Sequence, residues 1–147
     1  MELHGIQYSL IQRITADVAE FNGEVIWKYE GVKLPKKAPY CTVEHLLNGV
    51  LGLDKLHAYE ASTYNFQIGI FTERHADLIK LQEKVKRVLM GKDIPYYDTN
   101  TEPAIINGSF KATVTGITPI YGGDESETKG KHRSYLDVQV FSLNNLQ

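Results

Sequence analysis

The sequence predicts an α+β domain in which a mainly antiparallel sheet of about five strands carries two helices on one face. Several segments with the alternation of strands follow one another without a helix between them, which favours antiparallel pairing. Two segments, residues 5–21 and 72–90, instead have apolar residues at helical spacing. The third observation is a long C-terminal hairpin, residues 109–143, which we expect to project as an extended arm.

Length and composition favour one domain over residues 1–147. The chain has 147 residues, of which 42% are hydrophobic and 23% charged, as in ordinary globular proteins. A net charge of -2 argues against a protein that mainly grips phosphate backbones. The single Cys41 excludes an internal disulfide and a four-cysteine zinc site. Neither a signal peptide nor a membrane span is indicated, so we expect a protein that stays in the cytosol where it is made.

The first predicted helix covers residues 5–21. Its apolar stripe consists of Ile6, Leu10, Ile14 and Val18. The pair Asn22–Gly23 follows, and both residue types tolerate the left-handed conformation that ends helices.

Alternation predicts three strands in the next part of the chain. They are residues 25–29, 40–48 and 63–71, and the prolines of 32–39 predict a loop between the first two. The stretch 49–61 contains two glycines and fits either a hairpin or a short helix.

The second predicted helix begins at a Thr72 cap and ends at Met90, before Gly91. Residues 93–108 have the proline and asparagine content of a loop. The hairpin then closes the chain, with strands at 109–121 and 133–143.

The hairpin tip is a candidate interface. It is longer than a tight turn requires, with acidic residues on one limb and basic ones on the other. In a ring of identical subunits, one limb would face the opposite limb of a neighbour. The candidate interface comprises Tyr121, Asp124, Glu125, Glu127, Lys129, Lys131, His132, Arg133 and Tyr135.

The sequence shows no catalytic, cofactor or metal motif, and we predict none of these sites. Cys41 and His45 share a strand face and are a possible nucleophile pair, although a buried thiol is the commoner arrangement. Tyr96 and Tyr97, together with the Lys36–Lys37 loop, are a possible base-stacking surface. Contact with a protein partner is the favoured role for these tyrosines, because they have no basic surround.

The order of these elements resembles the tail terminator, or tail-to-head joining, proteins of long-tailed bacteriophages. The resemblance lies in the amphipathic N-terminal helix and the proline-bounded strand LPKKAPYCTVE. It continues in the strand and charged helix YNFQIGIFTERHADLIKLQEKVKRVL and in the closing hairpin that begins GSFKATVTGITPIYGGDES. It spans nearly the whole chain, apart from the stretch near 49–61.

This resemblance implies a structural virion protein and not an enzyme. Such proteins form a ring, expected to be a hexamer, that ends the tail tube and joins it to the head connector. Implied partners are the tube protein and a head completion protein, while DNA passes through the ring without sequence-specific contact. The implied place is the head-proximal end of the virion tail, assembled in the host cytoplasm. A head completion or minor capsid protein at the connector is the nearest alternative, followed by a small soluble binding module or enzyme.

Overall fold

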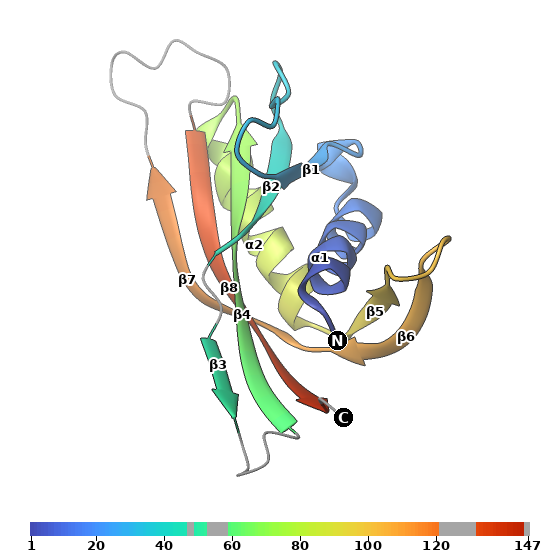
Figure 1. Ribbon diagram of the computed structural model, residues 1–147. Helices are drawn as coiled ribbons and strands as arrows, with labels where there is room; N and C mark the ends of the chain where they lie inside the picture. The colour runs from blue at the N-terminus through green and yellow to red at the C-terminus, as the bar shows by residue number, and fades with distance from the viewer. Residues whose placement is uncertain (47–48, 53–58, 121–131, 146–147) are drawn as a thin grey trace.

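The computed structural model describes residues 1–46, 49–52, 59–120 and 132–145. It has an α+β fold, in which two helices cover one face of a six-stranded, mainly antiparallel sheet (Figure 1). A second sheet of two strands packs beside the first helix (Figure 1). The predicted fold class is confirmed at this level, although the chain has more strands than predicted.

The helices are α1 (Leu3–Asp17) and α2 (His75–Met90), and a short 3-10 turn, Ala19–Phe21, follows α1. The strands are β1 (Val25–Lys28), β2 (Tyr40–His45), β3 (Gly49–Gly52), β4 (Tyr59–Thr72), β5 (Ile94–Asp98), β6 (Ile105–Phe110), β7 (Ala112–Ile120) and β8 (His132–Asn145).

The main sheet has the strand order β1-β2-β4-β8-β7. The pair β1–β2 is parallel, and the other neighbours are antiparallel. Strand β3 pairs with the first residues of β4, on the same edge that β2 occupies farther along. The undecided stretch 49–61 therefore contains a strand that returns antiparallel into β4.

Alternation along the central strands places the core on the helix side of the sheet. Tyr64, Phe66, Ile68 and Ile70 are all buried, as the sequence predicts. From β8, Leu136, Val138 and Val140 are buried in the same layer, opposite apolar residues of β4. Burial of each such side chain contributes about 1.5–3 kcal/mol before entropic costs.

The predicted start of the second helix is wrong. Thr72 belongs to β4, and its Oγ1 donates to the carbonyls of Arg74 (2.9 Å) and His132 (3.4 Å), not to the helix. The helix begins at His75 with Arg74 as its N-cap residue, which forms an ion pair with Asp77 at 3.0 Å. A threonine before a helix was ambiguous because it suits both a strand and a cap.

The prediction of a loop over residues 93–108 is also wrong, because β5 and β6 form an antiparallel hairpin there. Ile94 and Tyr96 face α1 and are buried, whereas β6 is exposed along Ile105–Ser109. A strand exposed on both faces has no alternation, and prolines in the segment argued for a loop.

The two strands of the C-terminal hairpin are present, but both lie inside the main sheet. β8 is flanked by β4 and β7, and β7 pairs with it from Ala112↔Val140 to Ile120↔Arg133. The connecting residues 121–131 lie outside the described part of the chain. The predicted tip residues Tyr121, Asp124, Glu125, Glu127, Lys129 and Lys131 are among them.

Gly5 allows α1 to pack directly on β5. A Cβ at this position would lie 2.6 Å from the Tyr97 carbonyl oxygen and 2.7 Å from the Tyr96 ring. The two elements are further joined by Ser9 Oγ, which accepts from the Tyr97 backbone N–H at 2.8 Å.

We predict that Gly5→Ala lowers the free energy of unfolding by about 1–3 kcal/mol, because a backbone carbonyl has no rotamer with which to yield. This loss outweighs the gain in helix propensity, at most about 1 kcal/mol. Urea unfolding measures it. Gly116→Ala is the control, since its Cβ would meet Asp137 Oδ2 at an ordinary 3.6 Å. Equal stability of the two variants would contradict the close packing of α1 on β5.

Candidate interaction surface

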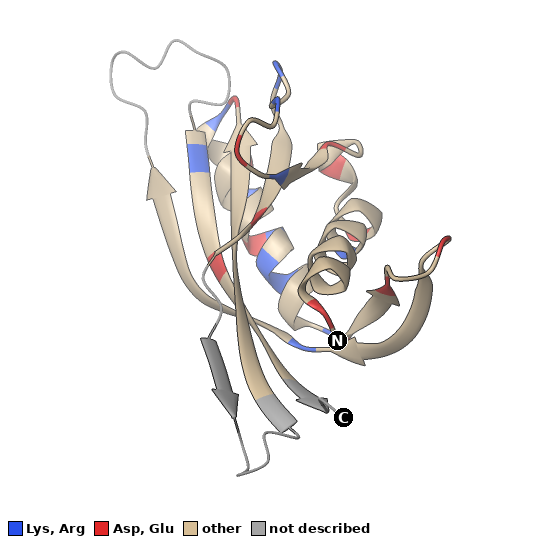
Figure 2. Cartoon of the chain, viewed as in Figure 1, with Lys and Arg blue, Asp and Glu red and all other residues tan. Residues whose placement is uncertain are grey.

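One face of the main sheet carries no helix (Figure 1). The register places the odd-numbered residues of β4 and β8 on this face, opposite one another in pairs such as Gln67↔Asp137 and Thr63↔Phe141. Most are uncharged, and charged residues gather mainly on the helices, in loops and near strand ends (Figure 2). The outward residues of the two central strands are Thr63, Asn65, Gln67, Gly69, Phe71, Arg133, Tyr135, Asp137, Gln139 and Phe141.

A small aromatic cluster covers one end of this face, near the start of β8. Tyr40 stacks on Phe71 with ring centroids 4.5 Å apart and planes 9° from parallel. Tyr135 meets Phe71 edge-on at 6.0 Å, and Ala38 completes the cluster. Such stacked and edge-on contacts stabilise by about 0.5–1.5 kcal/mol each beyond burial. The cluster is separate from the main core, on the other side of the sheet.

Three predicted interface residues lie within the described part of the chain, all at the start of β8. Tyr135 is half-buried in the aromatic cluster, and Arg133 is exposed on the same face. His132 is half-buried, with its ring centroid 6.0 Å from that of His75. The structure therefore brings Arg133 and Tyr135 together with Tyr40 and Phe71, which the sequence did not single out as site residues.

The electrostatics of the cluster agree with this placement. The pKa of Tyr40 is raised, chiefly because burial disfavours the phenolate, and Tyr135 raises it further. Arg133 acts in the opposite direction on this pKa. The positive charge of Arg133 favours the phenolate and so opposes the rise in this pKa.

The Cys41–His45 arrangement lacks the features of a nucleophile pair. Cys41 is fully buried, and burial raises the pKa of its thiol, which opposes thiolate formation. His45 lies four residues along the same strand, about 13 Å away at the usual rise. Its ring packs edge-on against Phe66 at 5.8 Å.

The proposed base-stacking tyrosines are also engaged within the protein. Tyr96 is only 4% exposed, and its hydroxyl accepts from the Glu2 backbone N–H at 3.0 Å. Tyr97 packs edge-on against Tyr8 at 5.6 Å. The loop between β1 and β2, which carries Lys36 and Lys37, lies well away from β5 (Figure 1). These residues do not form one surface.

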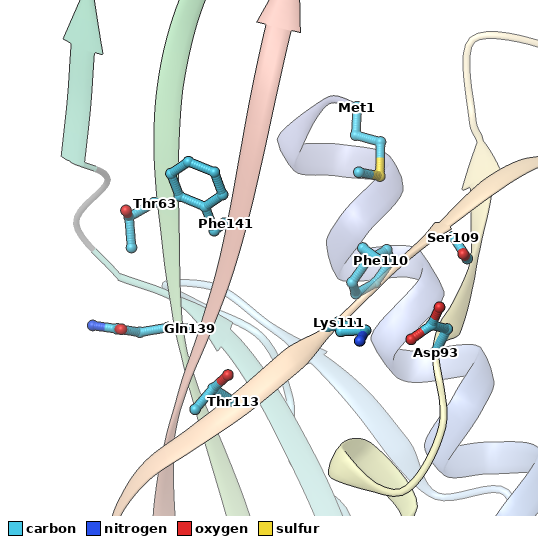
Figure 3. A pocket seen from close by; sticks show the side chains of 9 residues that line it. All are labelled: Met1, Thr63, Asp93, Ser109, Phe110, Lys111, Thr113, Gln139 and Phe141. Atoms are coloured by element: carbon cyan, nitrogen blue, oxygen red, sulfur yellow. The ribbon is translucent and has the colours of Figure 1, made fainter.

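A pocket of about 590 Å³ lies between β8 and the end of β6, where the chain passes from β6 into β7 (Figure 3). Phe110, Lys111 and Asp93 line one side, and Gln139 and Phe141 the other. Lys111 and Asp93 lie among mainly uncharged side chains here, and they do not form an acid–base pair or a metal-binding site. Within the described ranges, no group of three His, Cys, Asp or Glu residues is arranged to hold a metal ion. No described helix is both long and apolar enough to span a membrane.

Comparison with known proteins adds no identification. No protein-family model matches the chain, and no curated protein matches it in sequence.

The sequence reasoning missed the exposed apolar residues that lie outside the hairpin tip. Phe141 is 63% exposed on the uncovered face, and Ile105 and Ile106 of β6 are 53% and 60% exposed. A usable signal existed for Phe141, because the inward alternation of Leu136, Val138 and Val140 places residue 141 outward. No such signal existed for Ile105 and Ile106, because the sequence did not predict strand β6.

Burial of Cys41 generates a prediction about its chemistry. We expect iodoacetamide to alkylate the native thiol at least about 100-fold more slowly than the urea-unfolded thiol at the same pH. Mass spectrometry measures the two alkylation rates, and comparable rates in both states would contradict this placement of Cys41.

The raised pKa of the Cys41 thiol in the folded state also links folding stability to pH. The contribution of this thiol to stability is fully present below the unfolded thiol's pKa of about 8.5 and falls as pH rises above it.

Proposed function

We propose that this protein is a ring-forming structural subunit that ends the tail tube of a long-tailed bacteriophage and joins the tail to the head connector. The resemblance in element order supports the proposal. The observation that carries it is the large uncovered sheet face, which ends in an aromatic cluster beside the start of β8. A sheet face without a helix, on which Tyr135 is half-buried and Phe141 is exposed, is suited to protein contacts, in which Tyr and Phe are enriched.

The connection between β7 and β8, expected from the sequence to be the tip of an arm, belongs to this proposal. Residues 121–131 connect β7 to β8 and carry acidic residues before basic ones. In a ring, the acidic limb of one subunit would contact the basic limb of the next, a heterologous contact that closes by rotation. Arg133 and Tyr135 at the base of the connection would extend this contact onto the sheet.

The charge pattern also suits a ring through which DNA passes. The net charge of -2 is small, and the outward residues of β4 and β8 include one cation, Arg133. A surface without a concentration of Lys and Arg does not hold phosphates by counterion release. The proposal therefore has DNA transit without sequence-specific binding.

The proposal is tested on the purified protein, alone and with the tail tube protein. We expect native mass spectrometry and negative-stain electron microscopy to find closed rings with a central hole, or rings on tube ends. We also expect added protein to stop elongation of tubes that otherwise keep growing. A strict monomer that neither binds tubes nor changes their length would overturn the proposal.

Deletion of the gene in a phage separates the proposed role from one at the head. Loss of a terminator should leave overlong or unjoined tails. Normal tails together with heads that leak DNA would instead assign the protein to head completion.

Reversal of the basic limb tests the arm. We predict that the triple variant Lys129→Glu, Lys131→Glu, Arg133→Glu needs at least about a tenfold higher protein concentration to assemble into rings. Its free energy of unfolding should change by less than about 0.5 kcal/mol. The matched control reverses Lys33, Lys36 and Lys37, which changes the net charge equally in the β1–β2 loop. Sedimentation velocity compares the two, and equal assembly would remove the arm from the ring contact.

A further inference from the structure

A hollow of about 490 Å³ lies between the two helices, which pack side by side on one face of the sheet (Figure 1). Three segments line it: the C-terminal half of α1, the last turns of α2 and the connection from α2 to β5. One lining side chain, Asp17, is anionic, and four are cationic: Arg13, Lys84, Arg87 and Lys92. A chain with a net charge of -2 therefore has a local excess of positive charge here.

Two of the four cations are neutralised by carboxylates of the same chain. Arg13 forms an ion pair with Asp17, with Nη1 3.5 Å from Oδ2. Lys84 Nζ donates to both carboxylate oxygens of Glu20, at 2.8 and 3.0 Å. The positive excess of the hollow therefore comes from the other two cations.

Arg87 and Lys92 are these unpaired cations. Within the described part of the chain, neither side chain forms an ion pair or a hydrogen bond, and both are exposed. The helix dipole favours a cation such as Arg87 in the last turn of α2. Two unpaired cations beside one hollow nevertheless repel one another, and an anion between them would replace this repulsion with attraction.

The backbone carbonyl groups beside the hollow are already bonded. Carbonyl oxygens at a helix C-terminus are partly negative and would otherwise repel an anion. Arg13 Nη2 donates to the carbonyl oxygens of Asp93 at 2.7 Å and Lys92 at 3.4 Å. The Gly91 N–H donates to the Arg87 carbonyl oxygen at 2.8 Å. Arg13 thus also fixes the connection that carries Lys92 against α1.

We propose that this hollow binds a dianionic phosphate group, with Arg87 and Lys92 as its two charged contacts. A phosphate monoester carries a charge of about -1.5 to -2 at pH 7, which matches two unpaired cations. The planar guanidinium of arginine and the compact ammonium of lysine both bind phosphate oxygens well. The site lies between the helices, whereas the proposed function uses the uncovered sheet face. The two proposals are therefore independent of one another.

A second basic hollow, of about 390 Å³, is a useful contrast. Lys33, Lys36 and Lys37 line it together with Glu24, and all three lysines come from the loop between β1 and β2. This hollow has no arginine, and no pair of helices holds its cations in place. Attraction by charge alone would act at both hollows, whereas a built site favours the one between α1 and α2.

Amide NMR spectra of the isotope-labelled protein, titrated with inorganic phosphate at constant ionic strength, test the site. We expect saturable shifts at residues 13–17 and 87–92, with a dissociation constant of about 1–10 mM for so few, partly exposed ionic contacts. Dimethyl phosphate, which imitates the nucleic-acid backbone, and acetate each carry one charge. Both should bind at least about tenfold more weakly than phosphate. Equal binding of either one, or shifts that do not saturate, would overturn the proposal.

Removal of the two unpaired charges gives a matched comparison. The double variant Arg87→Gln, Lys92→Gln should weaken phosphate binding at least about tenfold. The control is Lys36→Gln, Lys37→Gln, which removes two exposed charges from the β1–β2 loop and should leave the dissociation constant within about twofold. Urea unfolding checks that both variants fold. Equal effects of the two double variants would reduce the binding to unspecific charge attraction and overturn the site.

A variant that tightens binding separates a phosphate site from a structural role of these charges. Asp17→Asn removes the carboxylate that lines the hollow, and it should strengthen phosphate binding at least about threefold. Glu24→Gln at the second hollow is the control and should leave phosphate binding unchanged. Weaker or unaltered binding by Asp17→Asn would contradict the placement of the phosphate between α1 and α2.

Discussion

Pairing between β4 and β8 is the interaction on which the rest of the fold depends. The two strands are in register along their whole length, from Tyr59↔Asn145 to Thr72↔His132. β2 and β3 attach to one side of this pair and β7 to the other, while both helices pack on its inner face. A shift of register by one residue would move Phe66 and Val138 from the core to the uncovered face. The requirement to bury these side chains therefore fixes the register, and with it the positions of all attached strands.

The same register explains which parts of the fold were predictable from the sequence. Residues 63–71 and 133–143 alternate clearly because one face of each strand is buried, and both were identified as strands. β5 and β6 were missed, since their burial depends on contact with α1 through Gly5 and Tyr96. A contact between segments some ninety residues apart produces no hydrophobic periodicity within either segment. Thr72 was misassigned because its hydroxyl bonds to two carbonyls, one of them across the sheet in β8.

The interaction surface was predictable only in part. Charge and length pointed to the hairpin connection, and Arg133 and Tyr135 at its base do lie on an uncovered face. Tyr40 and Phe71 lie beside them because of the register between β2 and β4, which no sequence motif predicts.

The central position of β8 also has a consequence for how the chain is made. Partners in the β4–β8 ladder are separated by at least 60 residues, so this pairing is of high contact order and is expected to form slowly. During synthesis, β4 emerges well before β8, and its inner side chains, such as Phe66 and Ile68, lack the strand that completes their layer. The nascent chain then carries an unfilled place in the middle of its sheet. Productive folding requires that its own last strand occupy that place before a strand from another chain does.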